Sequence, residues 1–380
     1  MKIPFNQIYT TGREIYYINN CIKSQGGQGK FYTKKVQDFI CGKFKASKVL
    51  LTTSCTAALE MAALLVNLGP EDEVIMPSFT FTSTANAVML RGAKPVFADI
   101  DGLTLNISPE DVEKKITSKT KAVIPVHYAG IACDMDKLLY IAKENGLFLI
   151  EDAAQAVNAL YKDRYLGTIG HIGCYSFHAT KNYTCGEGGA ILLNNIDPKM
   201  IKRAEYLWEK GTNRQAFLAG MVDKYTWVDV GSSYTPADLL AAYLYAQMEE
   251  LDIIYDFRRK VYERYYESLL EYEKKGLIRL PFIPSYAVSN YHIFYLLFTS
   301  EEHRNFVKEG LNKVGIEAVI HYMPLHLSPM GRRLGYKEGD LPVTEKAAST
   351  ILRLPLYPDL TEEKQEYILK NLSRLLNALE

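Results

Sequence analysis

The sequence lacks the features that would place it among nucleic-acid or membrane proteins. Its 380 residues carry 44 Lys and Arg against 44 Asp and Glu, so the formal net charge is zero. Such a chain has no overall field that attracts nucleic acid or an anionic membrane. No run of residues approaches the roughly 18 apolar positions of a membrane span. The start, MKIPFNQIYTTG, has Pro and Asn where a signal peptide needs apolar residues. We therefore expect a cytoplasmic protein that binds neither nucleic acid nor membrane.

Motifs for metals and for nucleotide phosphates are also missing. The six Cys residues form no CxxC pair and no metal-ligand spacing, so we expect free thiols in a reducing compartment and no metal site. Neither GxGxxG after a strand nor GxxxxGK[ST] occurs, and the glycines of 167–173 precede a predicted strand rather than a helix. These absences argue against a dinucleotide-binding dehydrogenase and against a P-loop enzyme.

What remains is an ordinary globular composition, with 48% hydrophobic and 23% charged residues. At roughly 150 residues per domain, the length favours two domains. Short β-rich runs alternate with helical stretches between about 48 and 195, which predicts a mostly parallel sheet with helices on both faces. The predicted strands are 48–52, 73–77, 94–99, 122–127, 147–151, 173–178 and 190–195, and the predicted helices between them are 56–68, 82–92, 108–116 and 134–146.

The pattern changes after residue 196. Residues 236–273 predict one long helix. It is followed by predicted strands at 291–298 and 316–322, with a helix at 300–315 between them, and by a last helix at 361–379. This order indicates a smaller α+β domain from about residue 252 onward.

Three segments of the first part carry residues that can do chemistry. A helix starts directly after the strand 48–52, and its free N–H groups form a natural anion site. Asp152 lies at the carboxyl end of a predicted buried strand, where ligands bind in open α/β sheets. Lys181 lies in a polar turn after another strand. Each has an ordinary alternative: helix capping by Ser54, helix capping by Asp152, and a solvated lysine.

The strings SCTAALEMAAL, VIMPSFTFTSTANAV, EDAAQA, SFHATKNYTCGEGGA and HYMPLH, in this order, resemble the DegT/DnrJ/StrS family of sugar aminotransferases. The resemblance covers essentially the whole chain. It implies the α/β fold type I of enzymes that use pyridoxal 5′-phosphate (PLP). It also implies a large PLP-binding domain at 1–251 and a small C-terminal domain at 252–380, on which the N-terminal segment packs.

The resemblance assigns roles around the cofactor. Lys181 is the lysine that bonds covalently to PLP and then moves the substrate proton. Asp152 faces the pyridine nitrogen and keeps it protonated, so that the ring withdraws electrons. Gln155 bonds the 3-oxygen of the ring, and Phe81 stacks on its face. The cofactor residues implied in this way are Cys55, Thr56, Ala57, Phe81, Asp152, Gln155, Ser176, Lys181 and Ser233.

Phosphate binding is implied for the helix start at Cys55, Thr56 and Ala57, together with the Ser176 hydroxyl. The sequence departs from the family pattern at one point. Many members carry an Asn that reaches the PLP phosphate of the partner subunit, and here the matching residue is Ser233. We therefore expect a homodimer with shared active sites in which this contact is altered.

The resemblance further implies transfer of an amino group from L-glutamate to carbon 4 of dTDP-4-keto-6-deoxyglucose. The product would be dTDP-4-amino-4,6-dideoxygalactose, used for a surface polysaccharide such as lipopolysaccharide or enterobacterial common antigen. His178 and His326 are expected near the substrate, with a satisfied core imidazole as the alternative for both. Local cations must bind the nucleotide, and Lys30, Lys210 and Arg214 are the candidates.

Other functions remain open from the sequence alone. The product could be the gluco epimer, or the substrate a UDP-sugar. A PLP-dependent sugar dehydratase is a further enzyme class, but the relatives with that activity carry His where this chain has Lys181. A non-catalytic protein that kept the fold would be expected to have lost Lys181 or Asp152, and both are present.

Overall fold

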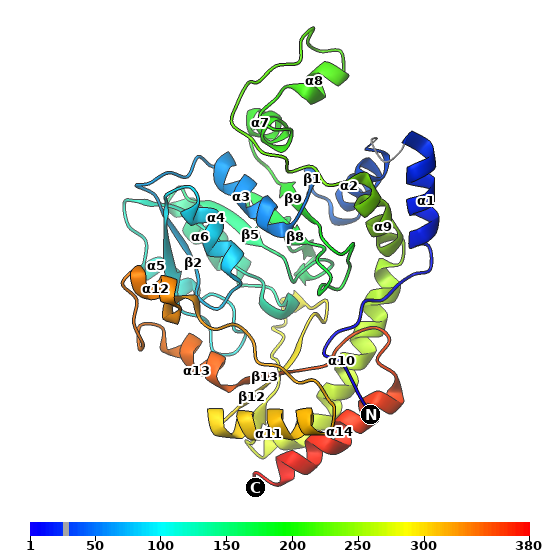
Figure 1. Ribbon diagram of the computed structural model, residues 1–380. Helices are drawn as coiled ribbons and strands as arrows, with labels where there is room; N and C mark the ends of the chain where they lie inside the picture. Colours follow the sequence, from blue (N-terminus) through cyan, green and yellow to red (C-terminus); the bar gives the residue numbers. More distant parts are fainter. Residues whose placement is uncertain (26–29) are drawn as a thin grey trace.

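A seven-stranded sheet forms the centre of the larger part of the molecule (Figure 1). The computed structural model describes residues 1–25 and 30–380. The strand order is β1-β9-β8-β5-β4-β2-β3. The strands are β1 (Lys48–Thr52), β2 (Glu73–Pro77), β3 (Lys94–Ala98), β4 (Thr120–Val123), β5 (Phe148–Asp152), β8 (Ile172–Ser176) and β9 (Gly189–Leu193).

All strand pairs of this sheet are parallel except the two pairs that β9 forms with β1 and β8. The predicted mostly parallel sheet is therefore confirmed. The carboxyl ends of β1, β5 and β8 point to the same edge, because these strands run in one direction. The reversed strand β9 starts at that edge, so its first residue, Gly189, lies among the three strand ends.

Helices cover both faces of the sheet, and the alternation of side chains along each strand separates two cores. In β1, Val49 and Leu51 pack in one core while Leu50 packs in the other. The first core lies under α2 (Phe31–Phe44), α6 (Met135–Glu144) and α9 (Asp238–Glu249). The second lies under α3 (Cys55–Leu65), α4 (Thr82–Met89) and α7 (Pro198–Trp208). Burial of apolar side chains on both faces drives this arrangement.

A second, three-stranded sheet, β10-β12-β13, forms the smaller part of the molecule. It packs with α10 (Leu251–Lys274), α11 (Glu301–Lys313) and α14 (Glu362–Asn377) in a separate core. Its strands are β10 (Ile278–Arg279), β12 (Phe294–Phe298) and β13 (Ile351–Leu354). The remaining elements are α1 (Glu14–Gln25), α5 (Pro109–Lys114), α8 (Arg214–Leu218), α12 (Pro329–Arg333), α13 (Pro342–Thr350), two 3-10 turns (Tyr128–Gly130 and Leu325–Leu327) and a small sheet of β6 (Leu160–Tyr161), β7 (Arg164–Tyr165) and β11 (Ala287–Val288).

Two predictions for this part were wrong. Residues 316–322 form no strand and pair only through isolated bridges, such as Val319 with Arg353. The third strand is β13, a four-residue run that directly follows a helix. The predicted helix 236–273 is two helices, because the backbone leaves the helical conformation at Glu250 (φ −108°, ψ 20°).

The N-terminal segment crosses between the two parts. Ile3 pairs with Ile316 of the smaller part, and the Phe5 N–H donates to Glu317 Oε2 at 2.9 Å. The Asn6 side chain donates to the carbonyl of Ala179 in the larger part at 3.4 Å. All six cysteines are free thiols. Within the described ranges, no helix has the length and apolar character needed to cross a bilayer.

Candidate active site

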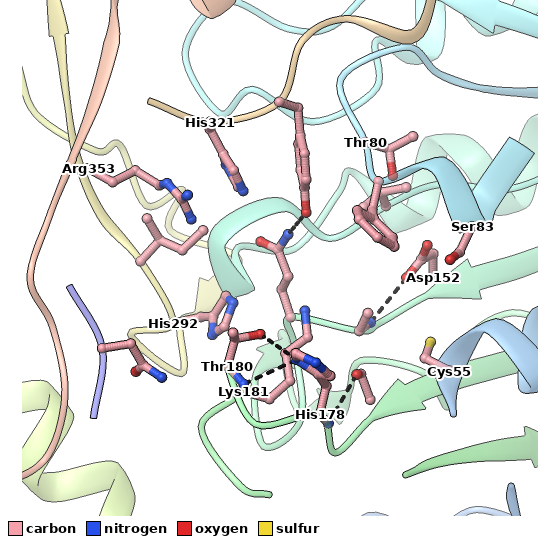
Figure 2. A pocket seen from close by; sticks show the side chains of 18 of the residues that line it. Cys55, Thr80, Ser83, Asp152, His178, Thr180, Lys181, His292, His321 and Arg353 are labelled. Atoms are coloured by element: carbon pink, nitrogen blue, oxygen red, sulfur yellow. Dashed lines mark hydrogen bonds between the residues drawn. The ribbon is translucent and has the colours of Figure 1, made fainter. Parts of the chain in front are cut away.

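A cavity of about 680 Å³ lies between the two parts of the molecule. The ends of β5 and β8 and the start of α3 form one wall, and residues of the smaller part form the other. Figure 2 shows Asp152, Ser83 and Cys55 on one side and His321 and Arg353 on the opposite side, with Lys181 between them. The cavity therefore brings together segments from almost the whole chain of 380 residues, from Phe5 to Leu356.

Gly189 brings the strand ends close together. It pairs with Thr52 on one side and with Ser176 on the other. A Cβ at this position would lie 2.3 to 2.5 Å from the backbone of Ser54 and Cys55, closer than any side chain allows. Only glycine lets β9 approach the start of α3 in this way. Gly189 thus has a structural role beside the cavity.

The start of α3 has backbone N–H groups of the kind that can bind an anion. Ser54 caps the helix, since its Oγ accepts the N–H of Ala57 at 3.1 Å. Ala57 therefore uses its N–H within the cap, which corrects its predicted part in phosphate binding. Cys55 and Thr56 occupy the first two helical positions, whose N–H groups have no partner within a helix. The Thr56 hydroxyl shares a hydrogen bond of 2.7 Å with Ser83, another cavity residue.

Lys181 lies in the loop between β8 and β9 and lines the cavity. Its backbone N–H donates to the His178 carbonyl at 2.9 Å, which fixes the turn. Among the described residues, no hydrogen bond or ion pair engages its Nζ. Burial lowers the pKa of Lys181, with Cys55 and Asp152 raising it and Arg353 lowering it further. A neutral, unengaged amine is the form that attacks a carbonyl carbon.

Asp152 ends β5 and is buried at the cavity wall. Its carboxylate accepts hydrogen bonds from the Thr84 hydroxyl at 2.8 Å and from the Ala154 N–H at 3.2 Å. Burial raises the pKa of Asp152, although these two hydrogen bonds and Lys181 oppose the shift. A buried carboxylate without an adjacent cation gains most from a ligand that brings a positive charge.

Three further predicted cofactor residues also line the cavity. Phe81 precedes α4 and is 59% exposed, so its ring face is available to a flat ligand. Gln155 accepts the Ala129 N–H at 2.7 Å and donates to the Tyr322 hydroxyl at 2.8 Å. Its amide nitrogen has a second N–H, which is the group left for a ligand oxygen. Ser176, at the end of β8, is also in the cavity wall.

The wall formed by the smaller part contains residues that the sequence did not reveal. His321 shares a hydrogen bond of 2.5 Å with the Tyr128 hydroxyl, and its ring stacks on that of Tyr322. His292 shares one of 2.7 Å with Asn182. Burial places the pKa of both imidazoles well below their usual value, so both are neutral at pH 7. No motif marks His292, whereas His321 is the first residue of the HYMPLH string, in which the prediction had selected the second histidine, His326.

The two histidines predicted near the substrate differ in whether they line the cavity. His178 lines the cavity and is within hydrogen-bonding distance of Thr180 at 2.9 Å. His326 lies outside the cavity lining and is 0% exposed. Its ring nitrogens contact Ser78 Oγ at 2.7 Å and Glu345 Oε1 at 2.9 Å. The prediction for His326 is thus corrected to its alternative, a satisfied core imidazole, and His321 is the cavity histidine of this segment.

The three predicted nucleotide-binding cations lie together, away from the cavity lining. Lys30, Lys210 and Arg214 all form ion pairs with Glu209, whose side chain is 2% exposed. Lys30 also lies over the ring of Trp208 at 4.1 Å from its centre. One carboxylate faces three cations, so this cluster keeps a positive charge. Ser233 is exposed and bridges to Glu209 in the same region.

Tested against these positions, PLP fits the cavity. Lys181 offers an unengaged amine, Asp152 a buried acceptor for a ring N–H, and the start of α3 an N–H cup for a phosphate. The position agrees as well, because Cys55 and Thr56 at the start of α3 line the cavity. A bound PLP would supply an electron-withdrawing ring beside the substrate carbon.

Comparison with known proteins decides the family. The family model described as the DegT/DnrJ/EryC1/StrS aminotransferase family matches residues 10–373. The chain belongs to this family.

Proteins that are similar to this aminotransferase in sequence or in structure support the same family. It is 36% identical to the uncharacterized protein MJ1066 of Methanocaldococcus jannaschii, covering 86% of this chain and 84% of that protein. It is 34% identical to the spore coat polysaccharide biosynthesis protein SpsC of Bacillus subtilis, covering 91% and 89%. The PLP-form structure of the putative sugar aminotransferase Spr1654 from Streptococcus pneumoniae matches with a TM-score of 0.92 at 26% identity, covering 100% of both chains.

A PMP-form structure of Spr1654 matches equally well, with a TM-score of 0.92. The aminated and aldehyde forms of the cofactor are thus both found on this fold. The protein is a PLP-dependent aminotransferase of fold type I, as the sequence predicted.

Proposed function

We propose that this aminotransferase transfers the amino group of L-glutamate to carbon 4 of a nucleotide-linked 4-keto-6-deoxy sugar. The sugar carbonyl becomes an amine-bearing CH group, and glutamate becomes 2-oxoglutarate. The observation that carries the proposal is the unengaged Lys181 amine beside Asp152 in a cavity whose opposite wall includes His292, His321 and Arg353. The sugar aminotransferases among the structural neighbours support the substrate class.

Each of these cavity residues has a separate role in the proposed reaction. Lys181 Nζ takes the proton from the α-carbon of the donor and returns a proton to carbon 4 of the sugar. Asp152 holds the positive charge of the ring nitrogen in place. The N–H groups of Cys55 and Thr56 bind the cofactor phosphate with the Ser176 hydroxyl. Phe81 stacks on the ring, and Gln155 bonds its oxygen.

Within this class, we propose dTDP-4-keto-6-deoxyglucose as the acceptor and dTDP-4-amino-4,6-dideoxygalactose as the product, for surface polysaccharide synthesis in the cytoplasm. Lys181 delivers its proton from one fixed side, so the amine at carbon 4 has a single configuration, axial in this proposal. The printed name of the relative SpsC refers to a polysaccharide pathway, which supports this use of the product.

The test is incubation of the PLP-loaded enzyme with L-glutamate and a panel of dTDP- and UDP-linked 4-keto sugars, with the product read by NMR. The dTDP sugar should be aminated fastest and should carry the axial amine. An equatorial amine or a preference for the UDP sugar would contradict the proposed substrate and keep the aminotransferase. Release of a deaminated or dehydrated sugar would contradict the proposed reaction.

We further propose a homodimer whose active sites are shared. An arm formed by α8 and the residues up to Val230 projects from the body at the top of Figure 1. It exposes large apolar side chains, of which Trp227 is 75% exposed, as expected of an interface. The Glu209 cluster with Lys30, Lys210 and Arg214 lies where this arm begins, so a partner's cavity is within its reach in the proposed dimer.

Mixing two inactive variants tests the shared site. Lys181→Ala lacks its own amine, and a Lys210→Ala, Arg214→Ala double variant lacks two cluster cations. If the cluster serves the partner's cavity, mixed dimers contain one complete site, and activity returns on mixing. If activity does not return although light scattering shows mixed dimers, each cavity uses its own cluster or none.

A further inference from the structure

His292 is a cavity residue whose ring is bonded to the turn that carries Lys181. Its Nδ1 lies 2.7 Å from the side-chain oxygen of Asn182, the residue that follows Lys181. The amide nitrogen of Asn182 donates to the Asn290 carbonyl at 2.8 Å. Because a carbonyl only accepts, this second bond fixes which end of the amide is the nitrogen, and the amide oxygen faces His292. His292 therefore donates from Nδ1.

This donor role determines where the ring of His292 has a lone pair. Burial lowers the pKa of His292 well below its usual value, and the charges of Lys181 and Arg258 lower it further, so the ring is neutral at pH 7. A neutral imidazole with its proton at Nδ1 has a lone pair at Nε2. The bond to Asn182 is the one hydrogen bond of this ring among the described residues. In Figure 2 the ring lies between Lys181 and Arg353. His292 thus offers the cavity an uncharged hydrogen-bond acceptor.

The backbone at His292 is fixed to both parts of the molecule. Tyr291 has a left-handed conformation (φ 55°), which a residue with a side chain rarely adopts. Arg258 of α10, which is 3% exposed, donates to the Tyr291 carbonyl at 3.0 Å and to the His292 carbonyl at 2.7 Å. The Asn290 side chain donates to the Gln155 carbonyl at 2.9 Å. Such a conformation persists only where neighbouring contacts enforce it. These contacts therefore hold the ring in one position in the cavity wall.

The groups that are expected to bind near Lys181 differ in what they offer to an acceptor. The carboxylates of glutamate and the phosphate of the cofactor are themselves acceptors, so a lone pair repels them. The amino group of glutamate has donors, but it is directed at the reacting centre. In a 4-keto-6-deoxy sugar, carbon 5 bears a methyl group and carbon 3 bears a hydroxyl. The carbon-3 hydroxyl is therefore the O–H donor next to the reacting carbon.

We propose that His292 Nε2 accepts a hydrogen bond from the carbon-3 hydroxyl of the sugar and so selects keto sugars that carry this group. This inference rests on the proposed function and adds a specificity-determining residue to it. A sugar without the hydroxyl leaves the lone pair of Nε2 unpaired when it fills the cavity, which is unfavourable. The bond also orients the sugar ring, since carbon 3 is attached directly to the carbon that receives the amine.

The experiment removes the acceptor on the protein and the donor on the sugar. PMP-loaded wild type, His292→Phe and His292→Gln are mixed with the 4-keto sugar nucleotide or with its 3-deoxy analogue, in the absence of glutamate, and conversion is followed by absorbance. Phe keeps a flat ring without a lone pair, and Gln places an oxygen near the position of Nε2. With the hydroxyl sugar, the second-order rate constant should fall about 10- to 100-fold in His292→Phe and largely recover in His292→Gln. With the 3-deoxy sugar, the three proteins should agree within about threefold.

The glutamate half-reaction and sugar binding supply two further readouts. The PLP-loaded variants should convert with L-glutamate within about threefold of wild type, because glutamate offers no donor to Nε2. Calorimetry with dTDP-6-deoxyglucose, which has a hydroxyl at carbon 4 and cannot be aminated, measures affinity without turnover. This affinity should fall about tenfold in His292→Phe. His303→Phe is the matched control, since His303 on α11 bonds Thr299 at 2.9 Å and lies outside the cavity lining. The control should behave as wild type, and all melting temperatures should be unchanged.

Two outcomes would overturn the inference while an active wild type supports the proposed function. His292→Phe could discriminate against the 3-deoxy sugar as strongly as wild type does, which would assign the carbon-3 hydroxyl to another residue. It could also slow the glutamate half-reaction as much as the sugar half-reaction, which would assign His292 to a step common to both. If instead the wild type converts with glutamate and fails with every 4-keto sugar, the proposed function is wrong, and this inference is wrong with it.

Discussion

The two walls of the cavity differ in how their residues are placed. On the cofactor wall, Asp152 and Ser176 directly end strands, and Cys55 starts a helix that only two residues separate from the preceding strand. On the substrate wall, His292, His321 and Arg353 come from loops and from an edge of the small sheet.

The difference has a physical origin. Parallel strands bring their carboxyl ends to one edge wherever they lie in the sequence, so a polar residue at a strand end predicts a site. A loop residue reaches a cavity only through the packing of the elements around it. The cofactor wall is therefore readable from local patterns, and the substrate wall is not. Variants on each wall test this contrast.

The largest effect is expected for the residue between the walls. Lys181→Ala should abolish turnover, since no other amine lines the cofactor side of the cavity, and should leave the fold intact because the Lys181 Nζ has no partner among the described residues. Steady-state assay and circular dichroism measure the two effects. Lys137→Ala, on the exposed face of α6, is the control and should keep full activity. Appreciable transamination by Lys181→Ala would contradict its central role.

On the cofactor wall, Asp152→Asn should lower turnover by at least about a hundredfold, because it removes the charge that stabilises the protonated ring. PLP binding should weaken less than turnover. Thr84→Val, which removes only the 2.8 Å hydrogen bond to Asp152, should have a smaller effect in the same direction. Comparison of kcat with the PLP dissociation constant separates the two. If the turnover of Asp152→Asn were within a few-fold of wild type, Asp152 would have only a structural role.

The approach of β9 to the start of α3 offers a further test of the same wall. Gly189→Ala should weaken PLP binding by about tenfold or more, since the added Cβ displaces the backbone that forms the phosphate cup. Gly42→Ala is the control, because a Cβ there meets nothing within 4 Å and α2 favours alanine. Equilibrium dialysis measures PLP affinity. Equal affinity in both variants would show that the start of α3 does not bind the phosphate.

The smallest expected effect is a shift in the pKa of Lys181, which charged residues on both walls influence. Burial lowers the Lys181 pKa below its usual 10.5, Asp152 raises it and Arg353 lowers it. The rate at which the apoenzyme captures PLP should rise with pH as Lys181 loses its proton, and should level off below pH 10.5. Asp152→Asn should move this midpoint down and Arg353→Gln should move it up. Stopped-flow absorbance measures the midpoints. Shifts in the same direction for both variants would contradict the opposed positions of the two charges.

Much of the fold could be predicted from the sequence, because strand and helix periodicities are local. The strands at Lys48–Thr52 and Glu73–Pro77 have the predicted bounds, and the mostly parallel sheet follows from their order. The smaller part was predicted less well. Residues 316–322 have a β-rich composition but form no strand, since β12 pairs instead with β10 and β13. Pairing partners at long range, rather than propensity, decided that sheet.

The sequence by itself determined the cofactor chemistry: the motif around Lys181, Asp152 at a strand end, and the helix start at Cys55. Only the tertiary structure decided that His326 is a core imidazole and that the Ala57 N–H donates to the capping Ser54 side chain. It also decided that Arg353 faces the cavity without an ion-pair partner among the described residues. These outcomes depend on contacts between residues far apart in the chain, such as Ser78 with His326 and Phe5 with Arg353. A local pattern contains no information on such contacts, because burial and charge pairing are properties of the packed fold.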